Sequence, residues 1–194
     1  MRTSLNILGV FAFVAALGGA TQWLARDFEA DQAASRAQAR PQFREIAWQE
    51  LVPPGWDPLA QYRDQDIAQL DDGSAEAVAL ARRMRETWDN APTNRALDGA
   101  RVRLSGYVVP LESDQGRMSE FLLVPFFGAC IHVPAPAANQ MVHVRLAEPA
   151  ADLRTMDLVW VNGQLATGRT DSAMGMAGYR MLATDLQRRH TLPR

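Results

Sequence analysis

The sequence has little of the chemistry on which disulfide frameworks and multi-residue metal motifs depend. Its 194 residues include one cysteine, Cys130, and three histidines. A single cysteine cannot form an intramolecular disulfide, so in an oxidising compartment the thiol would be buried, metal-bound, paired with another chain or reactive. The sequence contains no Cys-x-x-Cys pair, no His-Glu-x-x-His motif and no glycine-rich phosphate loop.

Charge of one sign is not concentrated along the chain. The 20 basic and 22 acidic residues leave a net charge of -2 at pH 7. Basic residues cluster only at Arg82, Arg83 and Arg85, which fit the solvated face of a predicted helix. Because binding phosphates requires a concentrated basic face, the composition argues against a nucleic-acid partner.

The longest apolar run lies at the N-terminus. Residues 5–20 contain no charge, and Arg2 is the only charged residue before them. With the positions up to 24 included, the run is long enough for a membrane-spanning helix, which needs about 20 apolar residues. A signal peptide cleaved after Ala20 is the alternative, because small residues precede that site. Both interpretations make residues 1–24 a signal-anchor or signal peptide. Both place the folded domain at the cell inner membrane facing the periplasm, or free in the periplasm after cleavage.

The rest of the chain divides by composition. Residues 25–44 are rich in Ala, Gln, Arg and Asp and predict a linker or frayed helix. Residues 45–187 predict a single globular domain, and residues 188–194 a polar tail. Within the domain, apolar residues recur at helical spacing over 74–89, with Ser74 as the N-cap.

After Gly99 the apolar residues no longer recur at helical spacing but at every second position, which is typical of strands. The predicted strands span 100–111, 119–128, 141–147, 158–166 and 178–186. This pattern predicts an α+β, mainly β fold: a small five-stranded antiparallel barrel, OB-like, with N-terminal helices and the hydrophobic N-terminal segment before it. Gly106 and Gly163 lie inside strands and suit the sharp bends that close a small barrel.

The segment 124–144 contains the residues most suited to metal binding or catalysis. An apolar strand runs into Gly128 and is followed by Cys130 and His132, whose side chains share one side if the chain stays extended. A thiolate and an imidazole can both bind Zn²⁺ or Cu⁺. His143, eleven residues beyond His132, would return toward them in a hairpin. The spacing therefore makes Cys130, His132 and His143 candidate ligands of a metal, zinc foremost.

Two other interpretations of this thiol stay open. Free cysteine is among the most buried residue types and often packs as a small apolar side chain. A nucleophilic Cys130 with His132 or His143 as its base would instead make a thiol-dependent enzyme. No local signature of a cysteine hydrolase accompanies them, so an enzyme is the less favoured interpretation.

The same segment also predicts a binding loop. Gly128, Pro134, Asn139 and Gln140 would hold a ligand or a partner, and the alternative for the two amides is to cap the loop. Trp48, Trp56, Trp88 and Trp160 are interpreted as core anchors, with a partner groove as the alternative. A metal-free module that docks a membrane partner is thus the second functional hypothesis.

Three stretches resemble a bacterial family known only as a domain of unknown function: GYVVPLE (106–112), EFLLVPFFGACIHVP (120–134) and NQMVHV (139–144). The resemblance covers about residues 45–187. It implies an exported or lipid-anchored envelope protein, often encoded beside ABC transporter components and in some cases in zinc-responsive gene groups. An envelope accessory protein that binds or senses zinc for an ABC transporter is the first functional hypothesis.

Overall fold

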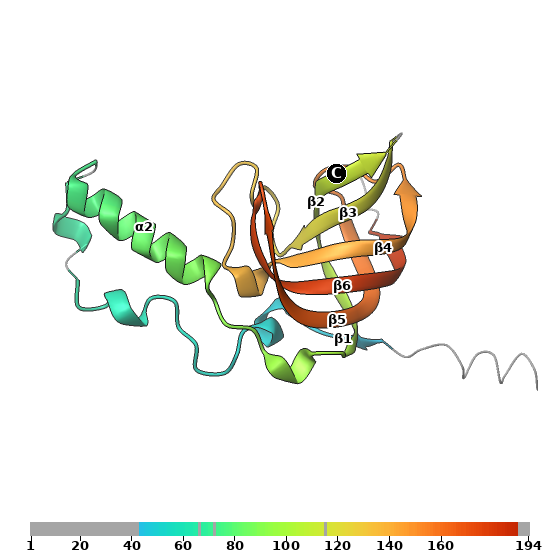
Figure 1. Ribbon diagram of the computed structural model, residues 1–194, viewed down its shortest axis with the longest axis horizontal. Helices are drawn as coiled ribbons and strands as arrows, with labels where there is room; N and C mark the ends of the chain where they lie inside the picture. The colour runs from blue at the N-terminus through green and yellow to red at the C-terminus, as the bar shows by residue number, and fades with distance from the viewer. Residues whose placement is uncertain (1–42, 66, 72, 115, 190–194) are drawn as a thin grey trace, which may run out of the picture. The chain divides into compact units, whose positions relative to one another are not determined.

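The structure is a computed structural model that describes residues 43–189 except 66, 72 and 115 (Figure 1). The apolar run 5–20 and most of the predicted linker 25–44 lie outside the described residues. Within the part of the chain that is described, no helix is both long enough and apolar enough to cross a membrane.

Five strands close into a barrel. They are β2 (Arg101–Asp114), β3 (Arg117–Val124), β4 (Val142–Ala151), β5 (Leu158–Ser172) and β6 (Gly175–Arg188). Their order is β2-β3-β4-β6-β5, and β5 pairs back onto β2 (Figure 1). This confirms the predicted small, mainly β, OB-like barrel. Four pairings are antiparallel, and the pairing of β4 with β6 is parallel.

The inward side chains of each strand form the core, as the period of two predicts. Tyr179 on β6 and Phe121 on β3 are the largest fully buried side chains. The Tyr179 hydroxyl donates to Leu51 O at 2.6 Å and accepts from Asn94 N at 2.5 Å, so it ties two flanking segments to the barrel. Burial raises the pKa of the Tyr179 hydroxyl, and the hydrogen bond from Asn94 opposes this rise.

Strand β2 is long and serves two neighbours. Its first half, from Arg101 to Tyr107, pairs with β5, and its second half, from Tyr107 to Asp114, pairs with β3. The short strand β1 (Arg44–Glu45) runs parallel to the first half of β2. β1 leads into the 3₁₀ helix η1 (Trp48–Leu51). The segment before the barrel therefore lies along β2.

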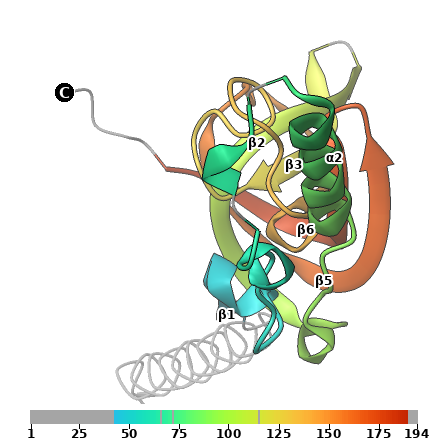
Figure 2. The ribbon, with the colours of Figure 1, turned by 90° about the vertical axis from the view of Figure 1, so that its left-hand side faces the viewer.

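Among the described residues, one α-helix, α2 (Ala75–Asp89), precedes the barrel. Ser74 Oγ accepts from Ala77 N at 3.1 Å, which confirms the predicted start of this helix. The helix reaches the loop between β3 and β4 (Figure 2), because Arg85 Nη1 donates to Ala135 O at 2.8 Å. Two further 3₁₀ helices, η2 (Ala60–Tyr62) and η3 (Ile67–Gln69), come before α2. Two more, η4 (Arg95–Leu97) and η5 (Ala138–Gln140), come after it.

Candidate functional site

The loop from residue 125 to residue 141, here called the β3–β4 loop, begins earlier than the sequence predicts. Strand β3 ends at Val124, so the predicted strand 119–128 is wrong in its last four residues. Gly128 has a φ of 86°, and its carbonyl oxygen accepts from the amides of Ile131, His132 and Val133 at 3.2, 2.8 and 3.3 Å. The chain forms a tight turn at this point instead of continuing as a strand.

This turn removes the premise of the metal hypothesis, which placed residues 130–132 in an extended conformation. Cys130 has a φ of 65°, in the left-handed region, and is half-buried. His132 is exposed, and His143 lies on β4, where its Nε2 is 2.9 Å from Glu120 Oε2. The described residues contain no group of three or more His, Cys, Asp or Glu side chains that could hold a metal ion. The structure therefore does not gather Cys130, His132 and His143 into one ligand set.

The surroundings of Cys130 favour the protonated thiol. Its side chain packs against an apolar cluster that includes Leu122 and Val124, whose positions alternate with the core residues of β3. Burial raises the pKa of the Cys130 thiol, and the charge of Arg85 only partly opposes this rise. A nucleophilic cysteine requires the opposite shift.

The two amides of the predicted binding loop contact backbone carbonyls of this chain. Asn139 is fully buried, and its Nδ2 donates to Pro92 O at 3.0 Å. Gln140 Nε2 donates to Trp48 O at 2.8 Å. Each amide thus fastens the end of the β3–β4 loop to a segment distant in sequence. Pro134 is exposed in the middle of the same loop.

The first part of the β3–β4 loop exposes large apolar side chains. Phe126 is 45% exposed, Phe127 65%, Ile131 39% and Val133 46%. We call these four residues the apolar tip. Large exposed apolar patches on soluble domains mark sites of interaction with proteins, membranes or ligands. Phe126 and Phe127 belong to the apolar run that predicts the strand 119–128, so their exposure differs from the prediction.

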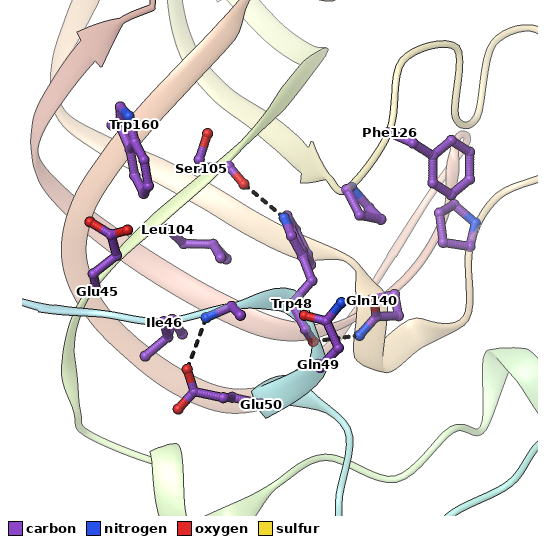
Figure 3. A pocket seen from close by; sticks show the side chains of 13 residues that line it. Glu45, Ile46, Trp48, Gln49, Glu50, Leu104, Ser105, Phe126, Gln140 and Trp160 are labelled. Carbon is purple, nitrogen blue, oxygen red and sulfur yellow. Dashed lines mark hydrogen bonds between the residues drawn. The ribbon is translucent and has the colours of Figure 1, made fainter.

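A hollow of about 720 Å³ adjoins the apolar tip (Figure 3). Figure 3 shows Trp160 on one side, Phe126 on the other and Trp48 between them. The indole Nε1 of Trp48 donates to Ser105 O at 2.7 Å. The remaining lining comes from β1 and η1, from β2 and from the β3–β4 loop: Glu45, Ile46, Ala47, Gln49, Glu50, Leu104, Ser105, Pro125, Pro136 and Gln140.

A second hollow has a volume of about 410 Å³ and is lined by Phe127, the chain neighbour of Phe126 in the first hollow. Its lining consists of Tyr107, Phe127, Met156, Asp157, Leu158, Arg188 and Arg189. Ser105 pairs with Trp160, and two residues further Tyr107 pairs with Leu158. Because residues two apart on a strand share a face, Ser105 and Trp160 of the first hollow lie on the same face of the β2–β5 ribbon as Tyr107 and Leu158 of the second. We call the two hollows together the aromatic groove.

Trp48 packs against the barrel core, as predicted, and also lines this groove. Trp160, which the sequence likewise predicts as a core anchor, is only partly buried and lines the groove. For Trp160 a signal was present. It lies between Val159 and Val161, which are both fully buried, so the period of two places it on the outer face. For Trp48 no local pattern exists, because its position follows from the docking of η1 on β2.

The fold and this surface define an OB-like barrel protein that carries a groove and an apolar loop on its outer face. The chain belongs to the family described as "Protein of unknown function (DUF3299)", whose model matches residues 48–188. This confirms the predicted membership of a family of unknown function.

One solved structure shows the same relationship. The crystal structure of a DUF3299 family protein from Pseudomonas aeruginosa PAO1 is 36% identical in sequence, with a TM-score of 0.59. The match covers 78% of this chain and 99% of that one. The yobA protein from Bacillus subtilis subsp. subtilis str. 168 matches 47% of this chain and 97% of its own at 18% identity, but its TM-score is 0.28. No curated protein matches the chain.

Proposed function

We propose that this protein is an envelope accessory protein that binds a partner protein at the inner membrane through the aromatic groove and the apolar tip. The observation that carries this proposal is the exposure of four large apolar residues on one loop, of which Phe126 and Phe127 line the groove. Burial of apolar surface is the main favourable term in most protein association. Partly exposed aromatic residues of the kind found here dominate the energy of many interfaces.

The β3–β4 loop is also held in place before any partner arrives. Asn139 and Gln140 in this loop donate hydrogen bonds to Pro92 O and Trp48 O. Arg85 on α2 donates one to Ala135 O in the loop. The amide of Gly128 additionally donates to Met156 Sδ at 3.2 Å. A loop that is already ordered loses little conformational entropy on binding, which favours affinity.

The location of the partner follows from the sequence. The uncharged run 5–20 would hold the chain at the inner membrane or export it across that membrane, so the domain would meet its partner on the periplasmic side. The resemblance to envelope proteins encoded beside ABC transporters makes a transporter component the expected partner.

Site-specific photo-crosslinking tests this proposal. A photoreactive phenylalanine analogue replaces Phe127 in one version of the full chain and Leu182 in another. Leu182 is the matched control, because it is 53% exposed but lies on β6, away from both hollows. We expect irradiation of intact cells to join position 127, and not position 182, to one membrane protein that mass spectrometry identifies.

The triple change Phe126→Ser, Phe127→Ser and Ile131→Ser should weaken capture through a second photoreactive position in the groove, Trp160. Circular dichroism of the triple variant checks that the barrel still folds. Equal adducts from positions 127 and 182, or no membrane-protein adduct from position 127, would contradict the proposed function.

A further inference from the structure

We infer that the aromatic groove accepts an extended peptide segment of the partner, with two apolar side chains two positions apart and opposite charges on its two flanks. This inference rests on the proposed function and adds the chemistry of the segment that is bound. It follows from the spacing of residue pairs that line the two hollows and from the charges in each lining.

The spacing of two residue pairs that line the hollows matches an extended chain. The first hollow contains the pair Ser105 and Trp160, and the second contains the next outward pair, Tyr107 and Leu158. Two residues along a strand correspond to about 7 Å. An extended peptide places alternate side chains on one face at the same interval, so residues i and i+2 can enter the two hollows together.

Aromatic side chains make both hollows suitable for apolar residues. Trp48, Trp160 and Phe126 line the first hollow. Phe127 lines the second and packs edge-to-face on Tyr107, with ring centroids 5.8 Å apart and an angle of 82° between the planes. Each hollow thus has aromatic walls and can take one aliphatic or aromatic side chain of the bound segment.

The first hollow has acidic lining. Glu45 and Glu50 both contribute to it, and none of its other lining residues is charged. Glu50 already binds Arg44 Nη1 at 2.6 Å and Ala47 N at 2.9 Å. Glu45 is exposed and forms no ion pair with any described residue. A basic residue of the bound segment would find its partner at Glu45.

The second hollow has the opposite balance, with two guanidinium groups and one carboxylate. Arg188 Nε is 3.4 Å from Asp157 Oδ2, which leaves Arg189 as the cation without a carboxylate among the described residues. The Arg189 guanidinium lies 5.8 Å from the centre of the Trp160 ring. An acidic residue of the bound segment would pair with Arg189.

The charged residues around the groove also disfavour two other occupants, a sugar and a surface of anionic lipid. A sugar ring would stack on an open aromatic face, but the guanidinium of Arg103 lies over the Trp160 ring at 4.6 Å from its centre. A surface of anionic lipid would bring negative charge to Glu45 and Glu50. A peptide with one basic and one acidic flank satisfies both ends of the groove.

Fluorescence anisotropy of labelled synthetic peptides tests the inference. The protein is the full chain in nanodiscs of neutral phosphatidylcholine. The probes are Ser-Lys-Leu-Thr-Leu-Glu-Ser, the same peptide with the two charges exchanged, and versions with Lys or Glu on both flanks. We expect at least one oppositely charged peptide to bind about two- to fivefold more tightly than either like-charged peptide, the range of an exposed ion pair. Replacing either Leu of that peptide by Ser should weaken binding about tenfold or more, because one apolar anchor is lost.

Two charge reversals in the protein should change this preference in opposite directions. Glu45→Lys should favour the peptide with two Glu flanks, and Arg189→Glu should favour the peptide with two Lys flanks. Both positions are exposed, so the barrel should keep its fold. The inference is overturned if no peptide binds, or if either variant keeps the preference of the wild-type protein.

Two further measurements separate this inference from the proposed function. Sedimentation with vesicles of phosphatidylcholine and phosphatidylglycerol, together with a glycan array, detects the other occupants; binding there without peptide binding overturns the inference. If crosslinking from position 127 still captures a membrane protein while every peptide fails, the proposed function stands and only the extended-peptide inference falls.

Discussion

Replacing Gly106 by alanine should damage the barrel and the aromatic groove together. A Cβ at this position would lie 2.7 Å from Val124 O, 2.8 Å from Leu123 Cγ and 2.9 Å from Trp48 Cζ2. All three distances are shorter than the 3.0 Å that Cβ atoms keep from other heavy atoms. Because Val124 O belongs to the backbone, it cannot move away without disturbing the end of β3. Trp48 would be pushed out of its position in the groove.

The magnitude follows from two opposing effects. Forcing a methyl group into a tightly packed site costs about 1–3 kcal/mol of folding free energy. The cost at Gly106 should lie near the upper end of this range, because the added methyl would meet a backbone atom. The φ of Gly106 is not in the left-handed region, so alanine can adopt its backbone conformation. Alanine also lowers the conformational entropy of the unfolded chain, which stabilises the folded state by about 0.4–1 kcal/mol. The net loss should be about 2 kcal/mol. For a domain of this size that lowers the Tm by roughly 4–8 °C.

Thermal unfolding of the full chain, followed by far-ultraviolet circular dichroism, measures this change. Ser105→Ala is the matched control, because the backbone oxygen of Ser105, and not its side chain, accepts the bond from Trp48. Its free energy of unfolding should stay within about 0.5 kcal/mol of wild type. If Gly106→Ala unfolds at the wild-type temperature, or Ser105→Ala loses as much stability, the packing argument for Trp48 is wrong.

Two further predictions concern Cys130. Its thiol should react slowly with iodoacetamide at pH 7 and much faster in urea, since burial raises its pKa in the folded state. With the folded pKa above the unfolded one, the stabilising contribution of the neutral thiol is complete below the unfolded pKa. It is lost as the pH rises through the folded pKa, so Cys130→Ala should flatten the alkaline loss of stability. Rapid alkylation of the native protein would contradict this assignment. From the geometry of the turn we also expect elemental analysis to find equal, near-zero zinc in the wild-type protein and in a Cys130→Ala, His132→Ala double variant; zinc that depends on both residues would support the metal hypothesis instead.

The helix and the barrel could be predicted because their signals are local. Helix α2 carries a cap at Ser74 and apolar residues at helical spacing, and both features act within a few residues. The strands follow from the period of two, which is visible wherever one face is buried and the other is exposed. Gly106 and Gly163 inside strands marked real close approaches, since a Cβ on Gly163 would lie 2.5 Å from Leu182 O.

The β3–β4 loop could not be predicted from its composition. Residues 124–133 are apolar enough to resemble a buried strand, but the chain turns after Val124 and exposes Phe126 and Phe127. The turn depends on Gly128, whose carbonyl oxygen accepts three amides. A short apolar run has the same appearance in the sequence whether it faces a core or a partner. The candidate metal site failed to assemble for the same reason, because it assumed that the strand continued.

The sequence by itself determined the elements and their inner faces: one capped helix, five strands of period two and the closure that such strands favour. These features depend on backbone geometry and on neighbours a few residues away. Only the tertiary structure decided that Trp48 and Trp160 line one groove, that Asn139 and Gln140 fasten the β3–β4 loop, and that Cys130, His132 and His143 do not form one ligand group. The groove and the loop contacts join residues 47 to 112 positions apart along the chain, and their geometry depends on barrel closure and strand register, which no local pattern encodes.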